Sequence, residues 1–135
     1  MITALDANIL IDLGLEDSVR ARQAAQALDE CGSMGKLVIC DVVLAEFARG
    51  LAESADPADW VRNRGVEFDP IGEETAVRAG RMQARLESRT GRPSQRPIAD
   101  FLIGAHALLQ TDRLLTRDRG FYRDYFRGLR LVEPK

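Results

Sequence analysis

Residues 2–11 read Ile2-Thr3-Ala4-Leu5-Asp6-Ala7-Asn8-Ile9-Leu10-Ile11, two apolar runs separated by a carboxylate and an amide. The first run, residues 2–6, has the length and composition of a short buried strand that ends at Asp6. Asn8 is a residue type that caps helices, and the second apolar run follows it. The segment therefore predicts a strand, a tight turn and a helix.

The same alternation of strand and helix continues along the chain. Further strands are predicted at residues 37–40, 66–69, 113–116 and 129–132. Helices are predicted from Asp17-Ser18 to Cys31-Gly32, from a cap at Asp41 through about Ala52, and at residues 57–65, 72–89, 98–110 and 121–126. Residues 90–97 hold two prolines and a glycine and predict a basic loop. This order predicts one α/β domain over residues 1–135, a three-layer α/β/α sandwich with a mostly parallel central sheet.

Size and composition exclude several classes of protein. The 135 residues, 45% of them hydrophobic, suffice for one compact core. No apolar run approaches the roughly 18 residues of a membrane span, and the N-terminal residues do not resemble a secretory signal. We therefore expect a cytoplasmic protein with no membrane segment. Cys31 and Cys40 are expected to be reduced, buried thiols, and a single histidine, His106, excludes metal sites with two or more histidines.

Charge is distributed unevenly between the two halves of the chain. Residues 1–77 carry six basic and 15 acidic side chains, whereas residues 78–130 carry 12 arginines and five acids. The planar guanidinium of arginine suits phosphate and carboxylate groups. The basic half indicates a polyanionic partner, whose identity the composition leaves open.

Four acids stand beside or inside strongly apolar runs, where an unpaired carboxylate is costly to bury. They are Asp6, Glu46, Asp100 and Asp118. Two strand ends and two helix starts place them at one edge of a parallel sheet, where such folds bind ligands. Taken alone, each has a simpler explanation: a helix cap for Asp6, a salt bridge to Arg49 for Glu46, the helix dipole for Asp100 and a turn for Asp118.

The convergence of these carboxylates predicts a cation site. Crowded carboxylates repel one another unless a cation neutralises them. Oxygen ligands without a histidine or cysteine set favour Mg²⁺ or Mn²⁺, which commonly bridge protein carboxylates to phosphate. The reaction that such a site fits is metal-assisted hydrolysis of a phosphodiester bond.

Three ordered segments and one helical acid carry a resemblance to a known family. They are Leu5-Asp6-Ala7-Asn8-Ile9-Leu10, Glu46, Ile98-Ala99-Asp100-Phe101-Leu102-Ile103-Gly104-Ala105-His106-Ala107 and Leu114-Leu115-Thr116-Arg117-Asp118-Arg119-Gly120-Phe121. Together they resemble the PIN-domain ribonucleases of the VapC toxin type over essentially the whole chain. The resemblance implies a Mg²⁺- or Mn²⁺-dependent endoribonuclease that a VapB-type antitoxin neutralises and that forms a homodimer.

The resemblance also implies roles for individual residues. Asp6, Glu46, Asp100 and Asp118 match the acidic quartet that holds the metal and orients or activates the attacking water. Asn8 and Thr116 match polar accessory positions, although a helix cap and an ordinary strand residue explain them equally well. The quartet is complete, and water attack predicts 5′-phosphate and 3′-hydroxyl products.

The basic half then gains candidate phosphate ligands. Arg96, Arg117 and Arg119 neighbour Asp100 and Asp118 in sequence and are candidates to hold RNA phosphates. A second group has the spacing of one helical stripe, although a solvated helix face explains it as well. Its members are Arg78, Arg81, Arg85, Arg89 and Arg92. We expect His106, Tyr122, Tyr125 and Phe126 to be core residues.

Two other functions remain open from the sequence. One is a Mg²⁺-dependent aspartyl-phosphate phosphatase or receiver-like domain, but Asn8 stands where a second Asp is expected, and neither lysine follows a late strand. The other is a PIN-like module that binds RNA or a protein partner without cleaving RNA. The complete acidic quartet favours the nuclease over this module.

Overall fold

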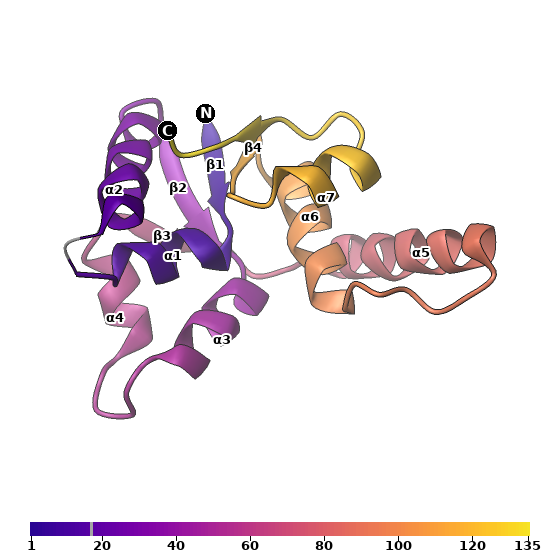
Figure 1. Ribbon diagram of the computed structural model, residues 1–135, viewed down its shortest axis with the longest axis horizontal. Coiled ribbons are helices and arrows are strands. Elements are labelled where there is room, and N and C mark those ends of the chain that lie inside the picture. The colour runs from indigo at the N-terminus through magenta and orange to yellow at the C-terminus, as the bar shows by residue number, and fades with distance from the viewer. Residues whose placement is uncertain (17) are drawn as a thin grey trace.

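A computed structural model describes residues 1–16 and 18–135, and within them five short strands form one parallel sheet (Figure 1). The strands are β1 (Ile2–Leu5), β2 (Lys36–Ile39), β3 (Val66–Phe68), β4 (Arg113–Leu115) and β5 (Leu131–Val132). Their order is β3-β2-β1-β4-β5, and every neighbouring pair is parallel. The chain therefore builds outward from β1 on one side and returns to its other side through β4. This reversal next to β1 is where open α/β sheets bind ligands.

Helices cover the sheet on both faces, as the alternating pattern predicts. Those described are α1 (Ala7–Leu13), α2 (Val19–Gly32), α3 (Asp41–Gly50), α4 (Pro57–Arg62), α5 (Glu73–Thr90), α6 (Ile98–Gln110) and α7 (Arg119–Tyr125). In Figure 1, α2 lies on one side of the strands, and α6 and α7 lie on the other. The 18-residue α5, about 27 Å long at 1.5 Å per residue, packs along α6 and extends away from the sheet. The predicted three-layer α/β fold is confirmed.

Helix ends differ from the prediction at several positions. Asp6, and not Asn8, caps α1, because its Oδ1 accepts a hydrogen bond from the Ala7 amide at 2.7 Å. Asp41 is the first residue of α3 rather than its cap, and its Oδ1 accepts from the Ile71 amide at 3.2 Å. Helix α3 ends at Gly50 and α4 at Arg62, both earlier than predicted. Ser18 caps α2, and its predicted neighbour at the helix start, Asp17, lies outside the described residues.

Helix α6 passes through the core, as its apolar sequence predicts. Phe101 and every residue from Ile103 to Ala107 are buried. His106 is 1% exposed and its Nε2 lies 2.8 Å from Oδ2 of Asp69, which confirms it as a core residue. Tyr122 and Phe126 are also buried, whereas Tyr125 is 38% exposed. Cys31 and Cys40 are buried free thiols, as expected.

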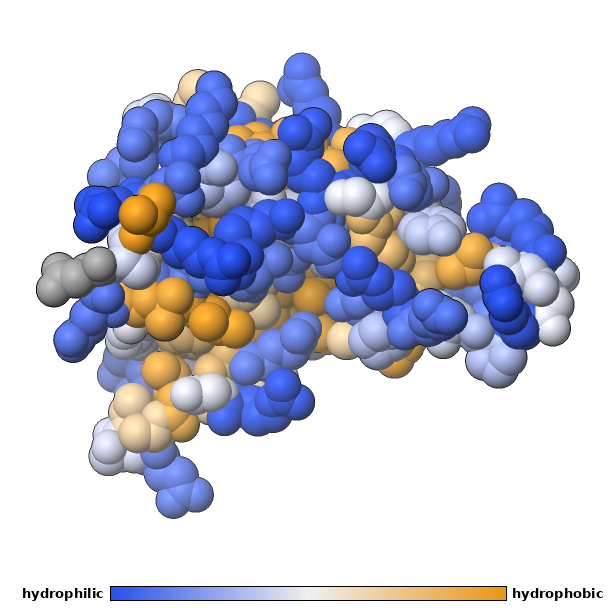
Figure 2. All heavy atoms as spheres, viewed as in Figure 1, coloured by the Kyte–Doolittle hydropathy of each residue, from blue (hydrophilic) through white to orange (hydrophobic). Residues whose placement is uncertain are grey.

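The surface is mostly polar, with apolar side chains gathered over α1 in the view of Figure 2. Ile11 of α1 and Leu15, two residues beyond its end, are among the exposed large hydrophobic residues. Four arginines of the predicted stripe, at 78, 81, 85 and 89, are exposed on α5. Arg92 does not belong to this stripe, because α5 ends at Thr90 and the next residue, Gly91, has a left-handed φ of 70°. Among the described residues, none of the helices has the length and apolar character needed to span a membrane.

Candidate active site

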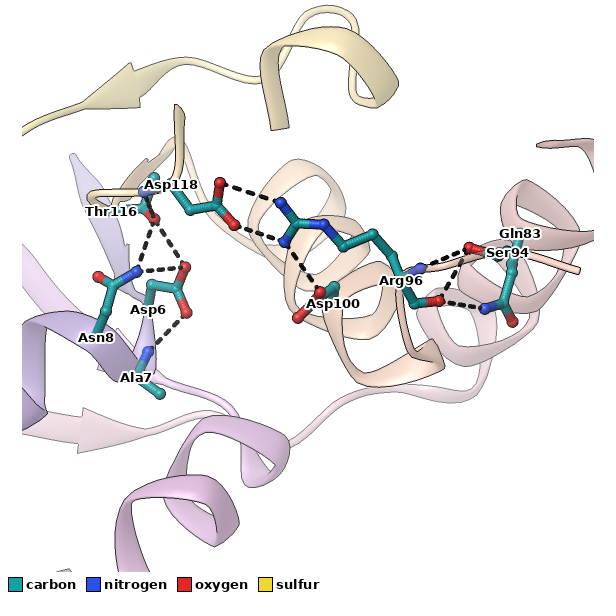
Figure 3. Close-up of polar contacts among 9 residues, drawn as sticks. All are labelled: Asp6, Ala7, Asn8, Gln83, Ser94, Arg96, Asp100, Thr116 and Asp118. Carbon is teal, nitrogen blue, oxygen red and sulfur yellow. Dashed lines mark hydrogen bonds and ion pairs between the residues drawn. The ribbon is translucent and has the colours of Figure 1, made fainter. Parts of the chain in front are cut away.

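The register of two central strands brings Asp6 beside Thr116. Leu5 of β1 pairs with Leu115 of β4, and the Asp6 amide donates to the Leu115 carbonyl at 3.0 Å. The residue after each strand therefore lies at the same carboxyl edge. There the Thr116 hydroxyl donates to Oδ2 of Asp6 at 2.7 Å, while the Ala7 amide donates to Oδ1 (Figure 3). Both oxygens of Asp6 are thus held in place.

Asn8 and Thr116 connect the two strand ends. The Asn8 Nδ2 lies 3.4 Å from both Oδ2 of Asp6 and Oγ1 of Thr116. The Asn8 Oδ1 accepts from the Arg117 amide at 3.3 Å, and the Thr116 Oγ1 accepts from the Asp118 amide at 2.9 Å. One hydroxyl therefore orients the Asp6 carboxylate and the backbone of Asp118 together.

Burial dominates the electrostatics of Asp6. Asp6 is only 7% exposed, and this burial raises its pKa. Hydrogen bonds from Thr116, Ala7 and Tyr122 lower this pKa, and the negative charge of Asp100 raises it. Tyr122 is itself buried beside Asp6 and Asp100, so its pKa is raised and its hydroxyl stays protonated. Sequence reasoning missed this contact, because an aromatic residue in an apolar helix usually belongs to the core.

Asp100 and Asp118 share the guanidinium of Arg96. Nη1 of Arg96 lies 2.6 Å from Oδ2 of Asp118 and 3.2 Å from Oδ2 of Asp100, and Nη2 lies 3.3 Å from Oδ1 of Asp118. Figure 3 shows the guanidinium between the two carboxylates. Its Cζ lies 4.5 Å from the centre of the Phe121 ring, a cation–π contact. Hydrogen bonds to the two acids, Asp118 above all, raise the pKa of Arg96 further.

Side chains from α5 and the following loop hold the backbone of Arg96. The Gln83 Nε2 and the Ser94 Oγ each donate to the Arg96 carbonyl at 3.0 Å, and the Arg96 amide donates back to the Ser94 Oγ at 3.1 Å. The Ser94 amide in turn donates to Oε2 of Glu87 at 2.7 Å. Sequence reasoning missed Gln83 and Ser94, since only the loop conformation brings them together.

Glu46 lies farther out than predicted. It occupies the second turn of α3 rather than the helix start, and it is exposed rather than buried. Partial burial raises its pKa most, the charges of Asp6 and Asp100 raise it further, and Arg49 lowers it. The pKa of Glu46 therefore depends on the charges of Asp6 and Asp100. Among the ion pairs of the described residues, none joins Glu46 to Arg49.

The three candidate phosphate ligands have different surroundings. Only Arg96 contacts the acids of the quartet. Arg117 turns to the buried Asp12, with Nη2 3.1 Å from Oδ1, and Arg119 lies 3.2 Å from Oε2 of Glu133. Arg117 and Arg119 thus already have carboxylate partners away from Asp6.

The donor set suits a hard divalent cation in its chemistry, since Asp6, Asp100, Asp118 and Glu46 supply only oxygen. In the part of the chain that the structure describes, however, no three acidic, histidine or cysteine side chains are close enough to hold one ion together. Between Asp100 and Asp118 the neutralising charge comes from Arg96. A cation at this position therefore requires the guanidinium to move.

Replacing Thr116 with valine is expected to lower the free energy of unfolding by about 1–2 kcal/mol. The change removes the buried donor to Asp6 and the acceptor of the Asp118 amide while keeping the branched shape. Urea unfolding in EDTA measures the loss. Thr116→Ser, which keeps the hydroxyl, is the control, and an equal loss in both variants would exclude the hydroxyl as the cause.

The fold and this site define a class: parallel α/β proteins with an acidic centre beside the central strand. The family model of the PIN domain matches residues 3–126, and the chain belongs to this family. No match is found among curated proteins. The resemblance to PIN domains seen in the sequence is confirmed.

Three solved structures illustrate the similarity. A toxin–antitoxin complex from Klebsiella pneumoniae contains a chain 25% identical to this one, with 98% of both chains covered and a TM-score of 0.64. VapBC2 from Rickettsia felis, bound to a promoter DNA fragment, gives 19% identity, full coverage of both chains and a TM-score of 0.75. VapC20 of Mycobacterium tuberculosis, a toxin that cleaves the sarcin–ricin loop, is 15% identical to this chain. The match covers 95% of this chain and 98% of VapC20, with a TM-score of 0.64.

Proposed function

We propose that this protein is a Mg²⁺- or Mn²⁺-dependent endoribonuclease, the VapC-type toxin of a type II toxin–antitoxin pair. The observation that carries the proposal is the placement of Asp6, Asp100 and Asp118 at the carboxyl edge of a parallel sheet, within a PIN domain. VapC20 of M. tuberculosis is a toxin that cleaves the sarcin–ricin loop, which supports a cleavage reaction here.

Asp6, Asp100 and Asp118, with Glu46 nearby, are the residues that would hold the metal. When bound, the ion lowers the pKa of water and neutralises charge on the phosphate. The chain supplies orientation and proton transfer. Thr116 and Asn8 hold the Asp6 carboxylate. Glu46, whose pKa is raised in part by the charges of Asp6 and Asp100, would accept a proton from the attacking water on a carboxylate oxygen. Direct water attack leaves a 5′-phosphate and a 3′-hydroxyl.

The proposed partners follow from the relatives. The K. pneumoniae structure is a toxin–antitoxin complex, and the R. felis structure is a VapBC pair. We therefore assign a VapB-type antitoxin as the neutralising partner. From the resemblance of the sequence to VapC toxins we further propose a homodimer in the cytoplasm as the working form. We propose that residues 1–135 form the single domain that carries this function. The receiver-like alternative loses support, because Lys36 begins β2 at the opposite edge and pairs with Glu67 at 3.7 Å.

The test is cleavage of total cellular RNA by the purified, antitoxin-free protein in Mg²⁺ or Mn²⁺, with parallel reactions in EDTA. Asp100→Asn removes one charge of the quartet at nearly constant shape and is expected to abolish cleavage. Asp124→Asn makes the same change at an exposed position on α7, where the acid pairs with Arg123, and should cleave normally.

Discrete fragments from the natural protein, absent in EDTA and with Asp100→Asn, would support the proposal. Fragments ending in 2′,3′-cyclic phosphate would contradict attack by water. Intact RNA that stays bound to the folded protein in Mn²⁺ would instead favour the non-catalytic binding module.

A further inference from the structure

The guanidinium of Arg96 neutralises two acids that come from different segments of the chain. Asp100 lies in the first turn of α6, whereas Asp118 follows β4. A single nitrogen, Nη1, lies within 3.2 Å of an oxygen from each. The two oxygens are therefore brought close together around one positive charge. Carboxylate oxygens that converge on a common point are also what a hard divalent cation requires.

Hydrogen bonds fix the backbone of Arg96, whereas its side chain is partly exposed to solvent. Gln83 and Ser94 fix its carbonyl and amide, and Phe121 lies under its guanidinium. Its side chain is nevertheless 40% exposed, and the Asp118 side chain is 38% exposed. Partly exposed ion pairs of this kind are worth little net free energy, because water screens them and each long side chain loses rotamer freedom. The guanidinium can therefore leave without disturbing the loop backbone.

We propose that Arg96 is an internal cation that competes with the divalent metal for Asp100 and Asp118. In the metal-free protein Arg96 neutralises the pair, and metal binding displaces it. A guanidinium and a divalent cation at the same two oxygens repel each other, so each weakens the binding of the other. The inference rests on the proposed metal-dependent function and adds a residue that regulates loading of that site.

Once a metal displaces it from the two acids, the guanidinium of Arg96 is free to bind a phosphate. Its loop backbone remains anchored beside the acids, so the side chain stays within reach of a phosphate that approaches them. Arginine binds phosphate oxygens through paired N–H groups as readily as it binds carboxylates. Arg96 thus passes from the carboxylates to the RNA backbone once the metal has replaced it.

The test measures Mn²⁺ affinity by calorimetry, with no RNA present. Arg96→Gln removes the competing charge and is expected to bind Mn²⁺ about tenfold more tightly than the natural protein, a difference of about 1.4 kcal/mol. Arg96→Lys keeps the charge without the planar fork and should lie between them. Arg123→Gln, a matched loss of charge on α7 where the arginine pairs with Asp124, controls for the general electrostatic effect. It should change the affinity by less than about twofold, because salt screens an exposed charge.

Thermal unfolding supplies an independent readout. In EDTA, Arg96→Gln should unfold at a lower temperature than the natural protein, because Asp100 and Asp118 lose their shared cation. Saturating Mn²⁺ should close this gap, because the metal binds only the folded state.

Equal Mn²⁺ affinity in Arg96→Gln and the natural protein would overturn the proposal, as would equal gains in Arg96→Gln and Arg123→Gln or the absence of Mn²⁺ binding in every variant. Failure of the proposed function has a different signature. A protein that leaves RNA intact, yet binds Mn²⁺ more tightly after Arg96→Gln, would refute the nuclease and keep the competition.

Discussion

Replacing Asp6 with asparagine is expected to reduce RNA cleavage by about a thousandfold, equivalent to about 4 kcal/mol in the activation barrier. Asp6 is the most buried of the four acids, and Thr116 and Ala7 hold both of its oxygens. Its charge is therefore fixed where a cation and a reacting phosphate would meet. Asparagine has nearly the same shape but no charge. Initial cleavage rates at saturating Mn²⁺ measure the loss.

Although Asp6→Asn should lower activity, it should raise stability relative to the natural protein as pH rises. Burial raises the pKa of Asp6 above the ordinary value of an aspartate, so ionising this side chain opposes folding. Its contribution to stability is fully present below the unfolded pKa and is lost as pH rises through the folded pKa. Asparagine does not titrate, so Asp6→Asn should gain stability relative to the natural protein over that range in EDTA.

Urea unfolding at several pH values tests this trend. Asp29→Asn, which makes the same change at an exposed position of α2, should show no such gain. An Asp6→Asn protein that cleaves RNA within tenfold of the natural rate would contradict the role of Asp6, whatever its stability. A loss of fold would show as a changed urea transition, which separates it from a loss of chemistry.

Replacing Gly104 with alanine is expected to destabilise the protein by about 2 kcal/mol through overpacking. A Cβ at this position of α6 would lie 2.3 Å from Cζ of Phe126 and within 2.6 Å of two further ring carbons. Phe126 is 1% exposed and packs against Phe101, Phe121 and Tyr122, so its ring has little room to move. The strain would reach the site, because Phe121 also lies under Arg96.

Urea unfolding of four variants beside the natural protein separates this clash from the effect of alanine on a helix. Gly80→Ala lies in the middle of α5, where an added Cβ meets no atom within 4 Å, and should stabilise the protein by up to about 1 kcal/mol. Phe126→Leu shortens the ring that Gly104 faces. The double variant Gly104→Ala, Phe126→Leu should lose less stability than the two single losses combined. Strict additivity, or a stable Gly104→Ala protein, would contradict the clash.

Much of the fold was predictable because apolar periodicity and breaking residues determine where elements lie. Helix α6 was predicted with its observed bounds, since an apolar run follows Pro97 and ends before the strand of Leu114 and Leu115. Helix caps were less predictable. Asp6 and Asn8 both suit a cap, and only the pairing of β1 with β4 determines which of them lies at the helix start.

The site was predictable where it follows from topology and not where it depends on a loop. Parallel strands share a carboxyl edge, which placed Asp6 near Asp118. The position of Arg96 depends instead on contacts between α5 and residues 91–97, and sequence spacing carries no record of them. Glu46 was misplaced for a related reason: its neighbours Val43 and Phe47 are buried, but the helix turns Glu46 itself outward.

The pairing of β1 with β4 has a consequence for synthesis in the cell. Strand β1 has one neighbour, β2, early in the chain, but its other neighbour, β4, begins only at Arg113, and the hydroxyl that binds Asp6 belongs to Thr116. A ribosome adds the N-terminal residues first, and such distant contacts are slow to form because a long loop must close. A nascent chain therefore carries Asp6 without Asp100 and Asp118 until residues 100–118 have been made. For the endoribonuclease proposed above, this delay would keep an unfinished chain inactive toward RNA.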